Sequence, residues 1–122
     1  MTLKVLAIDD SRTIRELLQQ SLGKAGFAVT TAVDGVDGVE TFQTAEVDVV
    51  ITDINMPRMD GFGVITAIRG GEVNSKVPIL VLTTESGAEL KAKARGAGAT
   101  GWIVKPFEDT SLISALKRVA GV

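Results

Sequence analysis

The sequence predicts an α/β fold, in which a doubly wound, five-stranded parallel sheet carries helices on both faces. Two observations support this prediction. Five short apolar runs rich in β-branched residues alternate strictly with five stretches whose apolar residues recur at helical spacing. The 122 residues also have the length of one domain, with no internal repeat, low-complexity segment or linker to divide them. We therefore expect a single domain over residues 1–122.

The first two strands are expected at Lys4–Ile8 and Phe27–Ala32. Two aspartates follow the first strand, and either Asp10 or Ser11 can cap the helix that comes next. Gly26 is placed to end that helix. The second strand is weaker and contains two threonines, which is typical of an edge strand. The apolar residues at helical spacing in the first helix are Ile14, Leu17, Leu18 and Leu22.

A second helix is expected to begin at Asp34-Gly35, and the central strand follows it. Val49–Ile51 is an unbroken apolar run, as expected of a strand that is covered on both faces. This run delivers Asp53 to the exit of the strand, and Pro57 then ends the hydrogen-bonding ladder. The second helix places on one face Val36, Val39 and Phe42.

A third helix is expected from Asp60-Gly61 and a fourth strand at Ile79–Leu82. Ser86 and Glu89 have the spacing of a capping box, which predicts that the fourth helix begins there. This helix is rich in alanine and contains one large apolar residue, so we expect it to dock lightly on the sheet. The third helix is expected to turn inward Phe62, Ile65 and Ile68.

The fifth strand is expected at Trp102–Val104, and it ends at Lys105-Pro106-Phe107. Right-handed crossovers, together with a weak second strand at the edge, favour the flavodoxin-like strand order 2-1-3-4-5. The last helix is expected to bury Leu112, Ile113, Leu116 and Val119.

Composition excludes several classes of function. A net charge of −2 and a pI near 5.1 give no reason to expect nucleic acid or an acidic membrane surface as a partner. The chain has no cysteine and no histidine, which excludes thiolate zinc sites and every mechanism that needs an imidazole. No signal peptide or membrane-spanning run is visible, so we expect a soluble, cytoplasmic protein.

Chemically useful side chains follow four of the five strands. Since parallel strands leave a sheet at the same edge, the predicted topology gathers Asp9, Asp10, Asp53, Thr83 and Lys105. Two carboxylates ~4 Å apart repel by about 4 kcal/mol at an effective dielectric constant near 20. Lys105 can supply one positive charge, and a Mg²⁺ ion with oxygen ligands can supply the rest.

With a metal in place, Asp53 is a credible nucleophile that forms an aspartyl phosphate. Thr83 can donate a hydrogen bond to the phosphoryl group, and Lys105 can pair with a second phosphoryl oxygen. Each residue alone has an ordinary explanation, since paired aspartates cap helices, an aspartate forms turns and a lysine after a strand is usually solvated. All of these ordinary explanations would have to coincide at one edge of one sheet. A single functional site explains the same residues together.

These residues resemble the signature of the response regulator receiver domain, and the resemblance covers essentially the whole chain. Within that family, the segment 99–107 is similar to that of stand-alone, CheY-like chemotaxis regulators, so the resemblance implies a receiver with no effector domain. The motifs that carry it are Asp9-Asp10, Asp53 followed by Ile-Asn-Met-Pro, Asp60-Gly61, Thr83 and Lys105-Pro106-Phe107.

The resemblance implies that a histidine kinase donates a phosphoryl group to Asp53. It implies that Mg²⁺ is bound by Asp10, Asp53 and the backbone carbonyl of Asn55, with Asp9 acting through water. It also implies a cis peptide bond before Pro106. The protein would catalyse only its own phosphorylation and dephosphorylation, and would not be an enzyme in the usual sense.

The resemblance further implies a switch, in which Thr83 moves toward the phosphoryl group and Trp102 turns inward. Asn55 and Glu85 occupy positions that tune phosphoryl lifetime. The altered surface is helix 4, strand 5 and helix 5, where a target binds. Candidate partners are a flagellar switch protein and a phosphatase, and the protein is expected to be a monomer.

Three alternatives differ in function. A single-domain phosphorelay intermediate would use the same pocket, and the sequence does not separate it from a chemotaxis regulator. A haloacid-dehalogenase-like phosphatase needs an aspartate two residues after the nucleophile, where this chain has Asn55. A flavodoxin needs a Ser-, Thr- and Gly-rich phosphate loop after the first strand, where this chain has the acidic Asp9-Asp10-Ser11.

Overall fold

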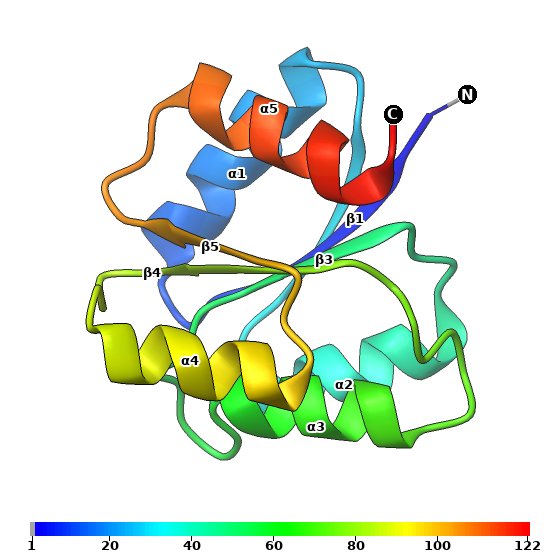
Figure 1. Cartoon of the computed structure of the whole chain (residues 1–122). Coiled ribbons are helices and arrows are strands. Elements are labelled where there is room, and N and C mark those ends of the chain that lie inside the picture. Colours follow the sequence, from blue (N-terminus) through cyan, green and yellow to red (C-terminus); the bar gives the residue numbers. More distant parts are fainter. Residues whose placement is uncertain (1) are drawn as a thin grey trace.

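The computed structural model describes residues 2–122 and confirms the predicted α/β fold, with five parallel strands in the order β2-β1-β3-β4-β5 (Figure 1). The strands are β1 Lys4–Ile8, β2 Ala28–Ala32, β3 Val49–Thr52, β4 Ile79–Thr83 and β5 Gly101–Val104. The helices are α1 Arg12–Lys24, α2 Gly35–Thr44, α3 Gly61–Gly70, α4 Ala88–Ala97 and α5 Asp109–Ala120. Each predicted strand and helix is present, with boundaries that differ by a few residues.

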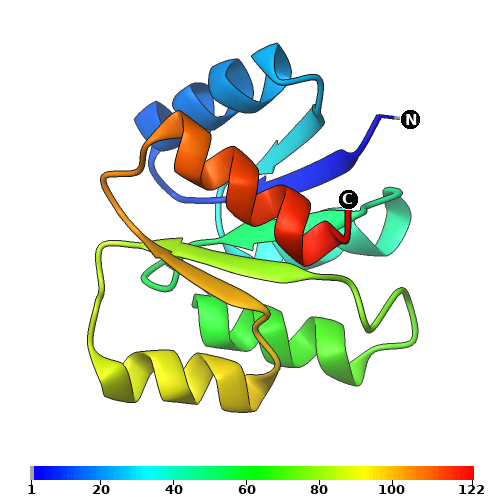
Figure 2. The ribbon, with the colours of Figure 1, turned by 45° about the horizontal axis from the view of Figure 1, so that its top comes forward.

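The sheet separates two layers of helices, with α1 and α5 on one face and α2, α3 and α4 on the other (Figures 1 and 2). Alternation along β1 supplies both cores, because Leu6 and Ile8 face α2–α4 while Val5 and Ala7 face α1 and α5. All four residues of β3 are buried, as the unbroken apolar run predicts. Asp53 therefore follows a central strand that is covered on both faces.

Helix starts agree with the sequence at three positions and disagree at one. Ser11, Asp34 and Asp60 cap α1, α2 and α3 through side-chain acceptors, as their residue types indicate. The predicted capping box at Ser86 is wrong. The backbone is still extended at Gly87, which is the N-cap of α4 and offers no side-chain hydrogen bond, so the helix begins one residue later than the capping box predicts.

Helical spacing alone does not determine which apolar residues of α1 and α4 are buried. Leu17 belongs to the apolar repeat of α1 but remains 46% exposed, because the helix turns Leu18 and Leu22 onto the sheet. In α4, Ala94 is the buried residue, which agrees with the expected light docking. In the described part of the chain, residues 2–122, no helix combines the length and apolar character needed to cross a bilayer.

Gly61 allows α3 to start directly against Asp53 and Ile54, which follow β3. A Cβ at position 61 would lie 2.2 Å from the backbone oxygen of Asp53 and 2.9 Å from the Cα of Ile54. Both neighbours are backbone atoms that cannot rotate away. Space rather than backbone conformation therefore requires glycine here.

Replacing Gly61 with alanine is expected to lower the free energy of unfolding by about 3 kcal/mol, the upper range for overpacking against a rigid neighbour. Gly23→Ala is the matched control, because a Cβ there meets nothing within 4 Å. This control should be stabilised by ~0.5–1 kcal/mol, since alanine suits a helix better than glycine. Urea denaturation compares the two variants, and equal unfolding midpoints would contradict the close approach.

Candidate functional site

The register of the sheet brings the predicted site residues to one edge. Ile8 pairs with Thr52, and Thr83 pairs with Val104, so the next residues along three strands are Asp9, Asp53 and Lys105. The ends of β1, β3, β4 and β5 thus converge as the sequence predicts. The peptide bond between Lys105 and Pro106 is cis, as expected.

Three carboxylates form the acidic part of the site. Asp9, Asp10 and Asp53 each offer a carboxylate oxygen, and these oxygens lie within 4.8 Å of one another. Asp9 and Asp53 are buried, whereas Asp10 is exposed at the rim. The donors are all oxygen atoms with negative charge, which fits a hard divalent cation such as Mg²⁺ and does not fit a soft metal.

Lys105 provides a positive charge beside the three carboxylates. Its Nζ donates to Asp9 Oδ2 at 2.7 Å and to Asp53 Oδ2 at 2.9 Å, and its side chain is 10% exposed. Burial lowers the pKa of Lys105, but its hydrogen bonds to the two carboxylates outweigh this and leave the pKa raised. Lys105 therefore carries its charge at neutral pH.

The environment of Asp9 disfavours the charged form of its carboxyl group. Burial raises its pKa above the ordinary value, although the hydrogen bonds from Lys105 and from the backbone N–H of Ser11 act in the opposite direction. Asp53 also lies close enough to contribute repulsion. One ammonium group is thus shared by two buried carboxylates, with a third at the rim. The unbalanced negative charge favours binding of an additional cation.

The nucleophile candidate Asp53 is oriented from its own backbone. Its Oδ1 accepts a hydrogen bond from the N–H of Ile54 at 2.6 Å, while Oδ2 accepts from Lys105. Thr52 is fully buried just before it, and its hydroxyl donates to the carbonyl oxygen of Asp53. These contacts direct both carboxylate oxygens toward the cluster.

Hydrogen bonds connect Thr83, at the end of β4, with Glu85 and Asn55. Thr83 is fully buried, and its Oγ1 accepts a long hydrogen bond, 3.4 Å, from the N–H of Glu85. Asn55 Nδ2 donates to Glu85 Oε1 at 3.2 Å, so the two side chains join the loops that follow β3 and β4. Their distance in sequence is 30 residues, and the sheet brings them together.

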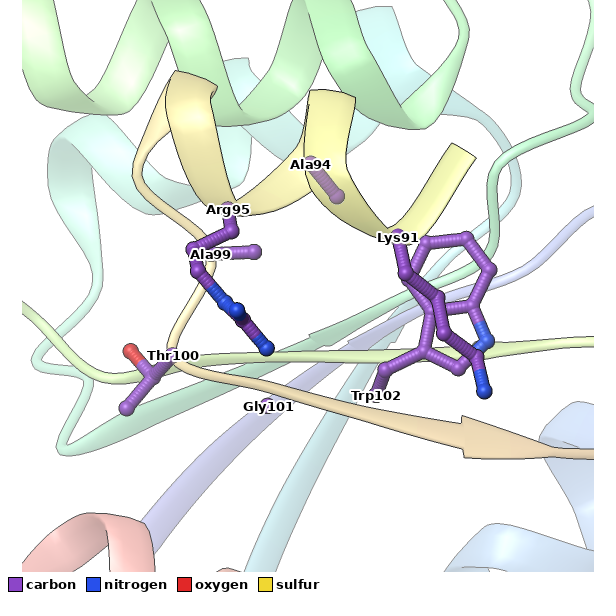
Figure 3. Close-up of a pocket in the computed structure, with 7 residues that line it drawn as sticks. All are labelled: Lys91, Ala94, Arg95, Ala99, Thr100, Gly101 and Trp102. Atoms are coloured by element: carbon purple, nitrogen blue, oxygen red, sulfur yellow. The ribbon is translucent and has the colours of Figure 1, made fainter. Parts of the chain in front are cut away.

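Trp102 connects Glu85 with α4 and β5. The indole is half-buried, packs against the core beneath α4, and donates from Nε1 to the carbonyl oxygen of Glu85 at 3.0 Å. Beside it lies a pocket of about 70 Å³ between α4 and β5, where Arg95 extends from the helix toward the strand (Figure 3). The pocket is lined by Lys91, Ala94, Arg95, Ala99, Thr100, Gly101 and Trp102.

The contact of Arg15 with the acidic loop was not predicted. Arg15 Nη1 donates to the backbone carbonyl of Asp9 at 2.8 Å and so ties α1 to the acidic loop. The sequence carries no signal for it, because the contact depends on the angle at which α1 leaves the sheet. The predicted residues Asp9, Asp10, Asp53, Thr83 and Lys105 do come together, and Asn55, Glu85 and Trp102 adjoin them.

Comparison with known proteins agrees with this geometry. The response regulator receiver domain matches residues 5–117. Protein PilG of Pseudomonas aeruginosa is 36% identical over 115 residues, which cover 94% of this chain and 85% of PilG. The chain spans about half, 49%, of the transcriptional regulatory protein PrrA of Mycobacterium tuberculosis.

Solved structures give the same result. Chemotaxis protein CheY4 of Vibrio cholerae is 44% identical with a TM-score of 0.93, covering 98% of this chain and 99% of CheY4. The receiver domain of a sensor histidine kinase from Pseudomonas aeruginosa is 25% identical with a TM-score of 0.91, covering the whole of both chains. A magnesium ion is coordinated in its active-site cleft.

Receiver domains take their phosphoryl group from histidine kinases. The cluster of Asp9, Asp10 and Asp53 is typical of their acceptor site. The chain belongs to the response regulator receiver family, and a receiver domain is a phospho-acceptor for signalling rather than a true enzyme.

Proposed function

We propose that this chain is a phosphorylation-activated protein of a two-component system that accepts a phosphoryl group on Asp53. The observation that carries the proposal is the contact of Lys105 Nζ with Asp53 Oδ2 at 2.9 Å, inside a cluster of three carboxylates. In the reaction, an Asp53 oxygen forms a bond to phosphorus as the phosphorus–nitrogen bond of a kinase phosphohistidine breaks. The imidazole nitrogen leaves with the electron pair of that bond.

The other residues of the site bind Mg²⁺ or contact the phosphoryl group. Asp10, Asp53 and the backbone carbonyl of Asn55 would hold Mg²⁺, with Asp9 acting through water, and all of these donors are oxygen atoms. When bound, Mg²⁺ neutralises carboxylate and phosphoryl oxygens. Lys105 orients Asp53 and pairs with a phosphoryl oxygen.

Asn55 and Glu85 are assigned to phosphoryl lifetime. Their side chains are joined by a hydrogen bond between the loops that follow β3 and β4, and in this proposal they control how water reaches the phosphoryl group to hydrolyse it. Thr83 is the reporter, since a phosphoryl oxygen that accepts from its hydroxyl draws the threonine toward Asp53. This new hydrogen bond is the differential contact that a two-state switch requires.

The peptide units around Glu85 connect Thr83 with Trp102. Glu85 N–H donates to Thr83 Oγ1, and the Glu85 carbonyl oxygen accepts from the indole of Trp102. Movement of Thr83 therefore changes the position of the loop that carries the indole's acceptor. The surface of α4, β5 and α5 is the target-binding face in this proposal.

Beryllofluoride stands in for the phosphoryl group. When it is added with Mg²⁺, we expect the fluorescence of Trp102 to change, because the hydrogen bond from the indole to the Glu85 carbonyl oxygen is altered. Trp102 is the only tryptophan, so the signal has one source. Thr83→Ala is the matched variant and should bind beryllofluoride with a much smaller change in fluorescence. An unchanged wild-type spectrum at demonstrated saturation would exclude the Trp102 switch.

Similarity to CheY4 favours a flagellar switch protein as target, in chemotaxis, and similarity to PilG favours a different target within the same class of function. A single-domain phosphorelay intermediate is the alternative. We infer a cytoplasmic monomer that has neither nucleic acid nor membrane as partner, in keeping with the net charge of −2.

The phosphorylated protein separates these possibilities. After phosphorylation by acetyl phosphate and Mg²⁺, it is offered in turn to a flagellar-switch peptide and to a histidine phosphotransfer domain. The proposal predicts phosphorylation-dependent binding of the peptide and slow loss of label. Rapid transfer of label to the phosphotransfer domain, with no peptide binding, would favour the relay and contradict the chemotaxis target.

A further inference from the structure

An ion pair outside the acidic cluster joins α2 to the loop that leaves Asp53. Arg58 Nε donates to Asp34 Oδ2 at 2.7 Å, and Arg58 Nη2 donates to Asp34 Oδ1 at 3.0 Å. The Asp34 side chain is 8% exposed and the Arg58 side chain 57% exposed. Such bidentate, charge-assisted contacts fix orientation as well as distance.

Asp34 is itself held in place by the helix that it caps. Its Oδ1 accepts from the N–H of Asp37 at 2.9 Å, and Asp37 Oδ2 accepts in return from the N–H of Val33 at 3.0 Å. The hydrogen bond from Arg58 is the main cause that lowers the pKa of Asp34. The anchor for Arg58 is therefore a rigid and fully charged carboxylate.

The loop formed by residues 53–60 is also in close backbone contact with α2. A Cβ at Gly35 would lie 2.2 Å from the backbone oxygen of Met59, so the loop passes directly over the first residue of the helix. The same loop contains Asn55, three residues before Arg58. A change in the path of residues 57–59 would therefore move the carbonyl group that is assigned to Mg²⁺.

The loop is not in a relaxed conformation at Arg58. Its φ of 66° lies in the left-handed region, which costs a non-glycine residue about 1–2 kcal/mol. Nothing about arginine favours this conformation, in contrast to asparagine or glycine. The bidentate contact with Asp34 opposes the tendency of the backbone to relax.

From this geometry we infer that Asp34 and Arg58 are positioning residues for the metal site, and that their ion pair holds the 53–60 loop in the path that Mg²⁺ binding needs. The inference rests on the proposed function, since it concerns the same site. Neither residue contacts the carboxylate cluster in the structure. The pair acts through the backbone of the loop.

The expected effect follows from the fraction of molecules whose loop is ready to bind. Apparent affinity falls in proportion to that fraction, so a loop that is competent in one third of the molecules binds Mg²⁺ about threefold more weakly. A half-buried ion pair of ordinary strength can produce a shift of this size. The dissociation constant for Mg²⁺ is therefore expected to rise about threefold when the pair is broken.

The experiment titrates Mg²⁺ into wild type and two single variants and follows backbone amide shifts of the 53–60 loop by NMR. Arg58→Asn removes the guanidinium but tolerates the left-handed backbone. Asp34→Asn removes the charge but preserves the helix cap. A through-space charge effect would strengthen Mg²⁺ binding in the first variant and weaken it in the second, whereas loss of the contact weakens binding in both.

Further variants test whether the two residues act as a unit. The double variant is expected to bind Mg²⁺ no more weakly than either single variant, because both remove the same contact. Arg58→Lys keeps the positive charge but cannot make the bidentate guanidinium contact. Its affinity for Mg²⁺ should lie between those of wild type and Arg58→Asn. Lys4→Gln is the control, because it breaks the Lys4–Glu46 pair at the opposite end of β1, and it should bind Mg²⁺ like wild type.

The outcomes distinguish this inference from the proposed function. If wild type binds Mg²⁺ and both single variants bind it with unchanged affinity, or with changes of opposite sign, the positioning role of Asp34 and Arg58 is wrong and the metal site stands. If wild type itself binds no Mg²⁺, the proposed function fails, and this inference with it. Weaker binding in both variants, without additivity, supports the inference.

Discussion

Replacing Lys105 with methionine is expected to lower the free energy of unfolding of the metal-free protein by about 3 kcal/mol, the lower range for removing one partner of a buried ion pair. Methionine preserves much of the side-chain volume and removes the charge. Asp9 and Asp53 would then remain buried at one edge without the ammonium group that both contact. The measurement is chemical denaturation in the presence of a chelator.

Two further conditions separate this electrostatic loss from a packing defect. Saturating Mg²⁺ should recover part of the stability, because a cation returns to the cluster. Lower pH should also reduce the loss. Burial already raises the pKa of Asp9, and a carboxyl whose folded-state pKa is raised stabilises the folded state as pH falls through that value. A loss of stability in Lys105→Met that depends on neither pH nor Mg²⁺ would contradict an electrostatic cause.

Arg12→Met provides the matched comparison for Lys105→Met. It breaks the Arg12–Glu16 ion pair, in which both side chains are more than half exposed. Exposed pairs at this helical spacing contribute about 0.3–0.5 kcal/mol. The stability of this variant should therefore stay near that of wild type and should depend little on Mg²⁺.

The sequence was sufficient to predict how the site is assembled, because that follows from topology. Strict alternation of strands and helices implies a parallel sheet, and all its strands leave at one edge. Asp9, Asp53 and Lys105 could therefore be grouped although 96 residues separate the first from the last. Aspartates at the starts of α2 and α3 were likewise readable, since a cap depends on neighbouring residues alone.

Contacts that depend on three-dimensional paths could not be predicted. The Ser86 capping box failed because a local motif competes with the extended loop that follows β4, and tertiary structure decides where α4 begins. The contact of Arg58 with Asp34 requires both a left-handed residue and a helix that starts beside it. The hydrogen bond from Trp102 to Glu85 depends on the orientation of one side chain.

Asp53→Ala is expected to abolish phosphorylation, because it removes the proposed nucleophilic oxygen, and the other two carboxylates of the cluster, those of Asp9 and Asp10, are assigned to Mg²⁺. The variant should nonetheless fold, since it removes one of three mutually repelling carboxylates. Unfolding by denaturant checks this, and retained stability would show that loss of label reflects loss of the acceptor.

The most direct measurement is incorporation of a phosphoryl group from acetyl phosphate, followed by intact mass in wild type, Asp53→Ala and Asp48→Ala. Asp48 precedes β3, at the opposite end of the strand that delivers Asp53, and serves as the control. We expect label in wild type and in Asp48→Ala when Mg²⁺ is present, loss of label with a chelator, and no label in Asp53→Ala. Equal labelling of Asp53→Ala and wild type would contradict it.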